Sequence, residues 1–201
     1  KLSKIIYPFV SAVMLLCGSS VYSQVSQQWA GSYNSPTNGS DDPVAMTVDN
    51  SGNIYVTGVS STSTTANDFI TIKYNSEGIQ QWASRYHNPD GQDDNVRGIA
   101  VDASGNVYVT GSISMGGSNG IQITVKYNPS GEQQWAKQLG EPTASPAAPG
   151  RGKGSIALDA SGNIYIGGSR RFGSGQNTAY LLIKYNPNGD SLWTRYYKGS
   201  H

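Results

Sequence analysis

Residues 102–111 carry the phrase DASGNVYVTG, and close copies of this phrase occur on either side of it, DNSGNIYVTG at 49–58 and DASGNIYIGG at 159–168. A second phrase follows each copy: IKYNSEGIQQW (72–82), VKYNPSGEQQW (125–135) and IKYNPNGDSLW (183–193). Successive tryptophans in the chain are 53, 53 and 58 residues apart, at Trp29, Trp82, Trp135 and Trp193. Three complete units therefore repeat along the chain, and such periods are typical of solenoids, propellers and other arrays.

Each unit divides into four short stretches rich in Val, Ile, Thr and Tyr, which we name strands A to D. Strand A is predicted at 44–49, 97–102 and 154–159, and strand C at 69–74, 121–127 and 180–185. Strand B begins at Ile54, Val107 and Ile164, and strand D is centred on Trp82, Trp135 and Trp193.

Turn residues join these strands in a regular way. Asp-x-Ser-Gly-Asn lies between A and B, where Asp and Ser can bond nearby backbone N–H groups and Gly can adopt a positive φ. Asn-x-x-Gly lies between C and D, with Pro after the Asn in two units, which is the preferred chemistry of a type I turn. Both connections are therefore predicted to be tight hairpins.

Alternation along the strands predicts sheets that are covered on both sides. In strand A, Ile99 and Val101 share one face, and the small residues Gly98 and Ala100 share the other. Repeated four-stranded antiparallel units of this kind predict an all-β protein, a β-propeller, with blades at about 41–86, 94–139 and 154–197. Residues 25–33 (VSQQWAGSY) resemble strand D and predict an extra outer strand before the first blade.

The two phrases together resemble the SBBP repeat, the bacterial seven-bladed β-propeller repeat, and more distantly the NHL-type repeat. The resemblance covers roughly residues 25–197. It implies a propeller in a secreted or cell-surface bacterial protein. Since the family has no single known reaction, the resemblance implies no catalytic residues.

Three blades do not close a ring, because propellers typically have four to eight. Strands A, B and C number three each, whereas strand D occurs four times when 25–33 is included. We therefore expect further blades after His201 in the native chain. The alternative is that two copies associate to form a six-bladed ring.

Residues 1–23 have the layout of a secretory signal peptide: Lys1 and Lys4, an apolar run to Cys17, then small and polar residues before Gln24. The chain is therefore expected to be secreted or displayed at the cell surface, with no membrane insertion once the signal is removed. Its formal net charge of +1 argues against nucleic acid or an anionic membrane as partner, since both need clustered positive charge.

The A–B and C–D turns are nearly identical in all units and share one rim, while the D–A and B–C loops differ and share the other. Recognition usually occurs on variable loops held by a rigid scaffold. We therefore expect protein or glycan binding at the second rim, with unselected connectors as the alternative.

Two clusters on that rim are candidate binding residues. Asp41, Asp42, Asp93 and Asp94 precede strand A in two blades and could bind Ca²⁺, although solvated turn acids are the commoner case. The basic cluster could contact an anionic glycan or an acidic protein, or could be a solvated patch: Arg151, Lys153, Arg170, Arg171 and Phe172. No other cofactor is expected, and capping is the preferred interpretation of the Asp-x-Ser-Gly-Asn turns.

Lys73, Lys126 and Lys184 recur in strand C, so each is expected to pair with an Asp of its A–B turn or to lie over a Trp ring. No nucleophile elbow, zinc-protease motif or phosphate-binding loop is present. The sequence therefore favours a non-catalytic scaffold for binding. The alternatives are a lyase or hydrolase whose site at the channel mouth needs further blades, and a structural spacer in a larger surface protein.

Overall fold

The computed structural model describes residues 27–36, 38–62, 66–88, 93–114, 120–139, 155–171 and 178–199. The predicted signal peptide lies outside these residues. The described residues form twelve strands: β1 (Asp41–Val48), β2 (Ile54–Ser60), β3 (Asp68–Tyr74), β4 (Gln80–Tyr86), β5 (Asp94–Val101), β6 (Val107–Ser114), β7 (Gly120–Tyr127), β8 (Gln133–Leu139), β9 (Ser155–Leu158), β10 (Ile164–Arg171), β11 (Thr178–Tyr185) and β12 (Ser191–Tyr197). Within the described ranges, no helix is long and apolar enough to cross a membrane.

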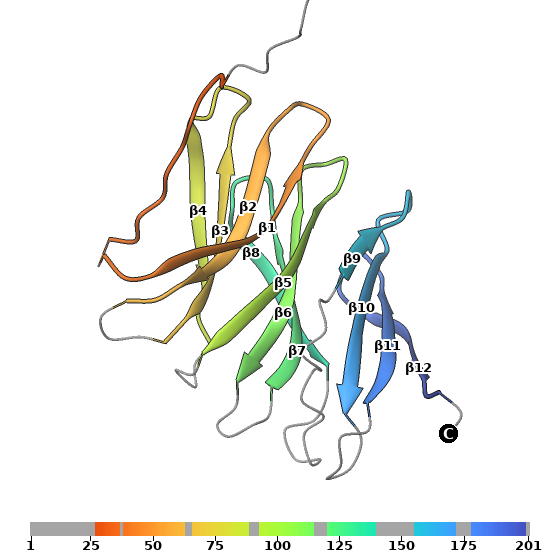
Figure 1. Cartoon of the computed structure of the whole chain (residues 1–201). Coiled ribbons are helices and arrows are strands. Elements are labelled where there is room, and N and C mark those ends of the chain that lie inside the picture. Colours follow the sequence, from red (N-terminus) through yellow and green to blue (C-terminus); the bar gives the residue numbers. More distant parts are fainter. Residues whose placement is uncertain are drawn as a thin grey trace, which may run out of the picture.

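The strands form three antiparallel sheets, each with its four strands in chain order: β1–β4, β5–β8 and β9–β12. We call these sheets blades one, two and three. They stand side by side in Figure 1, with the A–B and C–D turns at the upper end. The A strands β1, β5 and β9 contact one another in succession, so the blades converge along this inner edge. The prediction of an incomplete all-β propeller is confirmed, since three blades form no closed ring.

The hairpin turns follow the predicted chemistry. The glycines that end them have positive φ in all six cases, for example +81° at Gly105 in the A–B turn and +85° at Gly131 in the C–D turn. The Gly105 N–H donates to the Asp102 carbonyl oxygen, and the Gly131 N–H donates to the Asn128 carbonyl oxygen. A left-handed residue is therefore required there, which is why glycine recurs.

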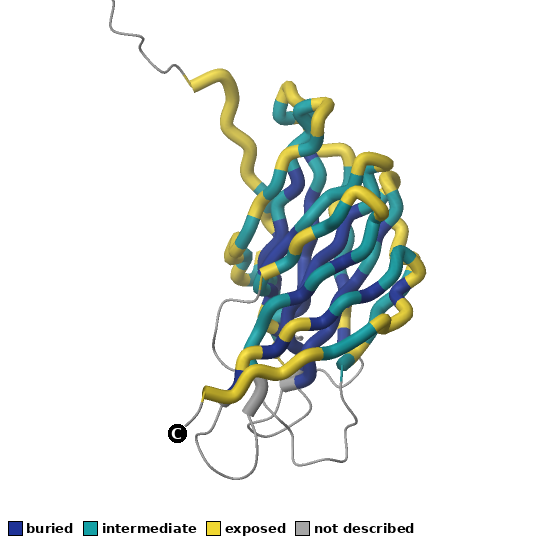
Figure 2. Tube along the Cα trace, turned by 90° about the vertical axis from the view of Figure 1, so that its right-hand side faces the viewer, coloured by how far each residue is buried: buried dark blue, intermediate teal, exposed yellow. Residues whose placement is uncertain are grey.

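Two of the three apolar clusters lie between neighbouring blades, and the third lies on the outer flank of blade one beside Tyr33. Figure 2 shows the buried residues along the strands and the exposed ones at the turns and in the N-terminal segment. Tyr55 and Phe69 of blade one pack with Ile123 and Val125 of blade two in a single cluster. A second cluster joins blade two to blade three, where Tyr108 packs with residues such as Ile183. Because side chains alternate along each strand, blade two has one face toward blade one and the other toward blade three.

A tryptophan and a glycine join each pair of neighbouring blades. Trp82 of β4 donates from Nε1 to the Pro129 carbonyl oxygen at 2.9 Å, in the C–D turn of blade two. Its ring lies so close to Gly131 that a Cβ at that position would be 2.7 Å from the indole. Trp135 lies equally close to Gly189 of blade three, where the corresponding distance is 2.9 Å. The indole therefore fits a space that exists only because the turn ends in glycine.

The predicted strand at 25–33 is corrected by the structure: residues 27–33, the described part, belong to no sheet. The segment runs down the outer flank of blade one (Figure 1). Trp29 stacks on Tyr74 with ring centroids 6.3 Å apart, and Tyr33 packs against the apolar cluster of Ile70, Ile72 and Tyr74. The segment thus has the position of a strand D, but the described residues offer no strand C on that flank for its backbone to pair with.

We predict that Gly131→Ala destabilises the protein more than Gly105→Ala. Both glycines have φ near +80°, so each substitution costs about 1–2 kcal/mol from backbone strain. Only Gly131→Ala also forces a methyl group against the Trp82 indole, since the nearest atom to a Cβ at Gly105 is 3.5 Å away. Urea unfolding followed by tryptophan fluorescence measures the difference, and equal losses would contradict the Trp–Gly contact.

We further predict that Asp159→Asn destabilises blade three in a pH-dependent way. The Asp159 carboxylate accepts hydrogen bonds from Asn163 Nδ2, the Asn163 and Ser161 N–H groups and the Tyr165 hydroxyl. These bonds, the Asn163 side chain first, lower the pKa of Asp159 from 3.8 to about 2. The wild type is therefore stabilised above pH 4 and loses this advantage as the pH falls from 4 to 2.

Urea unfolding at pH 7 and at pH 2 tests this prediction. The wild type should be the more stable at pH 7, and the difference from Asp159→Asn should shrink by pH 2. A difference that is the same at both pH values would show that the carboxylate charge does not matter.

Candidate functional site

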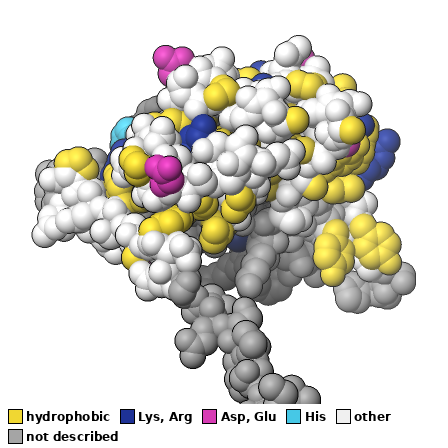
Figure 3. All heavy atoms as spheres, turned by 90° about the horizontal axis from the view of Figure 1, so that it is seen from above, with side chains coloured by type: hydrophobic (Ala, Val, Ile, Leu, Met, Phe, Trp, Pro, Cys, Tyr) yellow, Lys and Arg dark blue, Asp and Glu magenta, His cyan; other side chains and the backbone are white. Residues whose placement is uncertain are grey.

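The rim of A–B and C–D turns is uniform from blade to blade. Figure 3 looks onto this end of the molecule, where few of the visible side chains are charged. Within the A–B turns, Asp49, Asp102 and Asp159 each accept two backbone N–H bonds and two side-chain bonds from their own blade. All three carboxylates therefore cap their turns, which is the role that we preferred for the Asp-x-Ser-Gly-Asn motif on sequence grounds.

The electrostatics of this turn are local. Burial disfavours the charged form of Asp49, but hydrogen bonds from Asn53, Tyr55 and Ser51 outweigh it and lower the pKa of the carboxyl group. Burial, with the Asp49 carboxylate beside the hydroxyl, raises the pKa of Tyr55 far above its usual value of 10. The lowered pKa of Asp49 stabilises the turn near neutral pH, whereas the raised pKa of Tyr55 keeps its hydroxyl protonated as the donor to Asp49.

The lysines of strand C cover tyrosines and not tryptophans, which corrects the predicted Trp partner. Lys73, Lys126 and Lys184 lie 5.3, 5.2 and 5.0 Å from the ring centroids of the strand B tyrosines Tyr55, Tyr108 and Tyr165. The strand register sets each Lys between the Tyr of strand B and the Trp of strand D on the same face, and the ammonium group lies over the Tyr ring. The predicted ion pair is present in blade three, where Lys184 Nζ is 3.8 Å from Asp159 Oδ2.

The acidic pairs of the other rim are not equivalent, although the sequence suggested that they are. Asp41, Asp42 and Asp94 lie inside strands β1 and β5, because pairing continues past a bulge at Pro43/Ala45 and at Val96/Gly98. Asp41 of blade one and Asp94 of blade two occupy equivalent positions in their strands. Asp93 lies just before its strand. Asp93 Oδ1 accepts the Asn67 N–H at 3.0 Å and so links the B–C loop of blade one to blade two.

No metal site emerges from these acids in the described part of the chain, where no three His, Cys, Asp or Glu side chains gather to hold an ion. The basic cluster is only partly visible. Arg170 and Arg171 belong to β10 and not to a loop, because β10 stays paired with β11 up to Thr178. Arg151, Lys153 and Phe172 lie outside the described residues.

A polar cluster that sequence reasoning missed lies on the variable rim of blade one. Asp68 is almost fully buried and pairs with Arg85 at 3.0 Å and with His87 Nδ1 at 2.8 Å. The Arg85 guanidinium also donates to the carbonyl and hydroxyl oxygens of Ser60, at 2.8 and 2.6 Å. We call Ser60, Asp68, Arg85 and His87 the Asp68 cluster.

The Asp68 cluster occurs in one blade only. In blades two and three, the positions equivalent to Asp68 are Ile121 and Ala179, and those equivalent to Arg85 are Gln138 and Tyr196. Neither ion pair can therefore recur in those blades. Departure from the repeat was the signal that could have revealed it. It was missed because an Asp at the start of strand C resembles any other loop acid until the Arg85 side chain is seen to reach it.

The geometry of the cluster favours contact with a ligand by His87. The Asp68 side chain is 3% exposed, whereas the His87 side chain is 49% exposed. The carboxylate therefore anchors the imidazole through Nδ1, and the rest of the ring faces solvent. Such a ring can donate or accept a hydrogen bond from a fixed position, which suits recognition of hydroxyl or amide groups.

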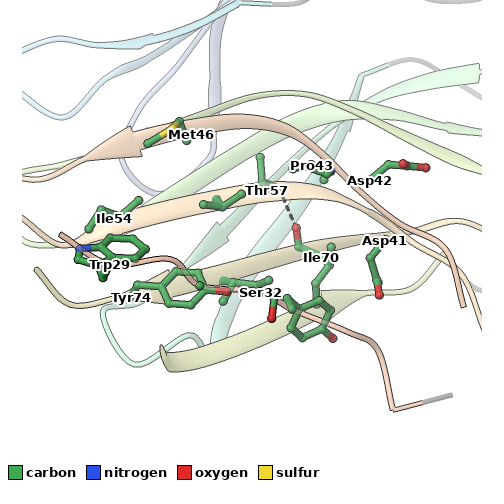
Figure 4. Close-up of a pocket in the computed structure, with 15 residues that line it drawn as sticks. Trp29, Ser32, Asp41, Asp42, Pro43, Met46, Ile54, Thr57, Ile70 and Tyr74 are labelled. Atoms are coloured by element: carbon green, nitrogen blue, oxygen red, sulfur yellow. Dashed lines mark hydrogen bonds between the residues drawn. The ribbon is translucent and has the colours of Figure 1, made fainter. Parts of the chain in front are cut away.

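A groove of about 440 Å³ lies between the N-terminal segment and the flank of blade one. Figure 4 shows Trp29, Tyr74 and Ile54 together at one end and Asp41 and Asp42 at the other. Asp41 Oδ2 accepts the Ser35 N–H at 2.8 Å, which ties the segment to the start of β1. The groove is mostly apolar, and it occupies the flank that in blades two and three is covered by the preceding blade.

Comparison with known proteins identifies the repeat. The SBBP β-propeller repeat matches residues 37–69 and 81–114. No curated protein matches the chain. A fucose lectin from Kordia zhangzhouensis, solved in complex with methyl-fucoside, is similar in backbone arrangement, with a TM-score of 0.45 and 14% identity over 78% of this chain and 97% of the lectin. Over these two stretches the chain is thus similar to the SBBP β-propeller repeat, in agreement with the strand order and turns described above.

Proposed function

We propose that this chain is a non-catalytic propeller module, secreted or displayed at the cell surface, that binds a protein or glycan through the rim of D–A and B–C loops. The Asp68 cluster carries the proposal. A scaffold needs the same contacts in every blade, whereas a binding site is needed once. The cluster is the non-repeated ion-pair network of the described rim, and it holds an exposed imidazole in place.

The rim around the cluster is held firmly. Asn67 is bonded twice to blade two, through its N–H to Asp93 and through its carbonyl oxygen from the Asp94 N–H. Arg85 fixes the end of β2 through Ser60. A site held by such bonds loses little conformational freedom when a ligand binds, which favours affinity.

The ligand should be polar and close to neutral in charge. Within the cluster, the Asp68 carboxylate already has the Arg85 guanidinium as counter-ion, so no strong field is left to attract an ion. The exposed His87 ring offers hydrogen bonding and a flat face. Both are suited to sugar hydroxyls or peptide groups.

We predict that His87→Ala weakens binding at least about tenfold, since it removes the exposed contact and leaves Asp68 paired with Arg85. The measurement is a glycan array, followed by titration calorimetry with the best-bound glycan and by pull-down with cell-surface proteins. Glu77→Ala is the control, because Glu77 is exposed in a C–D turn on the opposite rim. It should bind like the wild type.

A second pair of variants tests the basic residues of the same rim. If the rim binds an acidic partner, Arg170→Gln combined with Arg171→Gln should weaken binding and make it less dependent on salt. If neither His87→Ala nor this pair changes binding, the site lies elsewhere. A wild type that binds nothing would favour a structural spacer, and turnover of a bound polysaccharide would favour an enzyme.

A further inference from the structure

The two outer flanks of the described blades are complementary, because each matches a surface that is buried elsewhere in the chain. On blade one, Met46 is 62% exposed, whereas its equivalent in blade two, Ile99, is 9% exposed against blade one. On blade three, Tyr180 is 74% exposed, whereas its equivalent Phe69 is fully buried against blade two. Blade three of one copy therefore has the apolar face that fits blade one of another.

We propose that residues 27–33 are a cap that stops a second copy of this chain from adding its blade three to blade one. The capped partner is a copy of the same chain, because the contacts inside the chain show which surface fits this flank. The proposal is independent of the ligand-binding function proposed above.

The first argument is the occupied tryptophan site. A Cβ placed on Gly78 would lie 2.5 Å from the Trp29 ring, just as one on Gly131 would lie 2.7 Å from Trp82. Gly78 and Gly131 hold the same position in the C–D turn and have φ of +78° and +85°. Trp29 therefore fills on blade one the space that the tryptophan of a preceding blade would fill.

The second argument is that the match extends beyond this one contact. Trp29 stacks on Tyr74 at 6.3 Å, and Trp82 lies at the same 6.3 Å from Tyr127, the equivalent tyrosine of blade two. Four residues after each tryptophan comes a tyrosine, Tyr33 or Tyr86, that packs against the following blade. The segment thus copies the inward face of strand D over its described length.

The consequence is steric exclusion of one specific partner. A second copy would have to place Trp193 of β12 over Gly78, where the Trp29 indole already lies. Two indoles cannot share this space. Without the cap, the contact is head-to-tail, and such contacts generate rings when the rotation closes and filaments when it does not. With the cap in place, the apolar outer flank of blade one is partly covered, and the groove of Figure 4 remains between the two.

The test is analytical ultracentrifugation of the 201-residue chain over a range of concentrations, with circular dichroism to confirm folding. Trp29→Ala with Tyr33→Ala opens the tryptophan site and should make the chain associate, with a dissociation constant at least about tenfold lower than that of the wild type. Adding Gly78→Ala to this double variant places a methyl group in the opened site and should abolish association. Adding Trp193→Ala removes the incoming indole and should do the same.

Gly52→Ala is the matched control for Gly78→Ala, since both glycines have φ of +78° but a Cβ on Gly52 meets only Ser76, at 3.4 Å. Added to the opened chain, it should leave association intact. Three results overturn the proposal: an opened chain that stays as monomeric as the wild type, a wild type that associates as strongly, or association that survives both Gly78→Ala and Trp193→Ala. The last result would indicate non-specific sticking of the exposed apolar flank.

Discussion

The contact of a strand D tryptophan with the glycine turn of the next blade holds this molecule together. A single blade has two largely apolar faces and only four strands, so it cannot bury either face by itself. The indole crosses the gap between sheets and fills the space left by the missing Cβ, and that of Trp82 also donates its N–H to the Pro129 carbonyl of the neighbouring turn. The turn glycine thus serves two purposes: it adopts the positive φ of the turn and leaves room for the tryptophan of the preceding blade. Replacing it would disturb both the turn and the packing between the sheets.

The same requirement explains how the polar residues are divided. Carboxylates in the A–B turns are satisfied inside their own hairpins and need no partner from a neighbouring blade. Lysine and tyrosine then cover the outer part of each sheet without needing a buried counter-ion. Residues that recur in every blade thus stabilise the packing of the blades. The Asp68 cluster on the variable rim occurs in one blade only and has no such repeated role.

Much of the fold could be predicted because its signals are short-range. Period-two alternation and the turn motifs act over a few residues, and they located all twelve strands within a few positions. The strands that start at Asp41 and Asp94 were predicted to begin later, since a bulge that restores pairing leaves no mark in the alternation. Residues 27–33 match strand D in sequence but form no ladder, because a strand also needs a neighbour.

The three repeats, the order of strands in each blade and the conformation of the turns follow from the amino-acid sequence, since they depend on residues close together in the chain. The packing of strands and blades, in contrast, sets which tryptophan lies against which glycine, what covers the flank of blade one and how Asp68, Arg85 and His87 come together. Trp82 and Pro129 are 47 positions apart in the chain. Such contacts depend on how one sheet stacks on the next, and no local pattern records that distance.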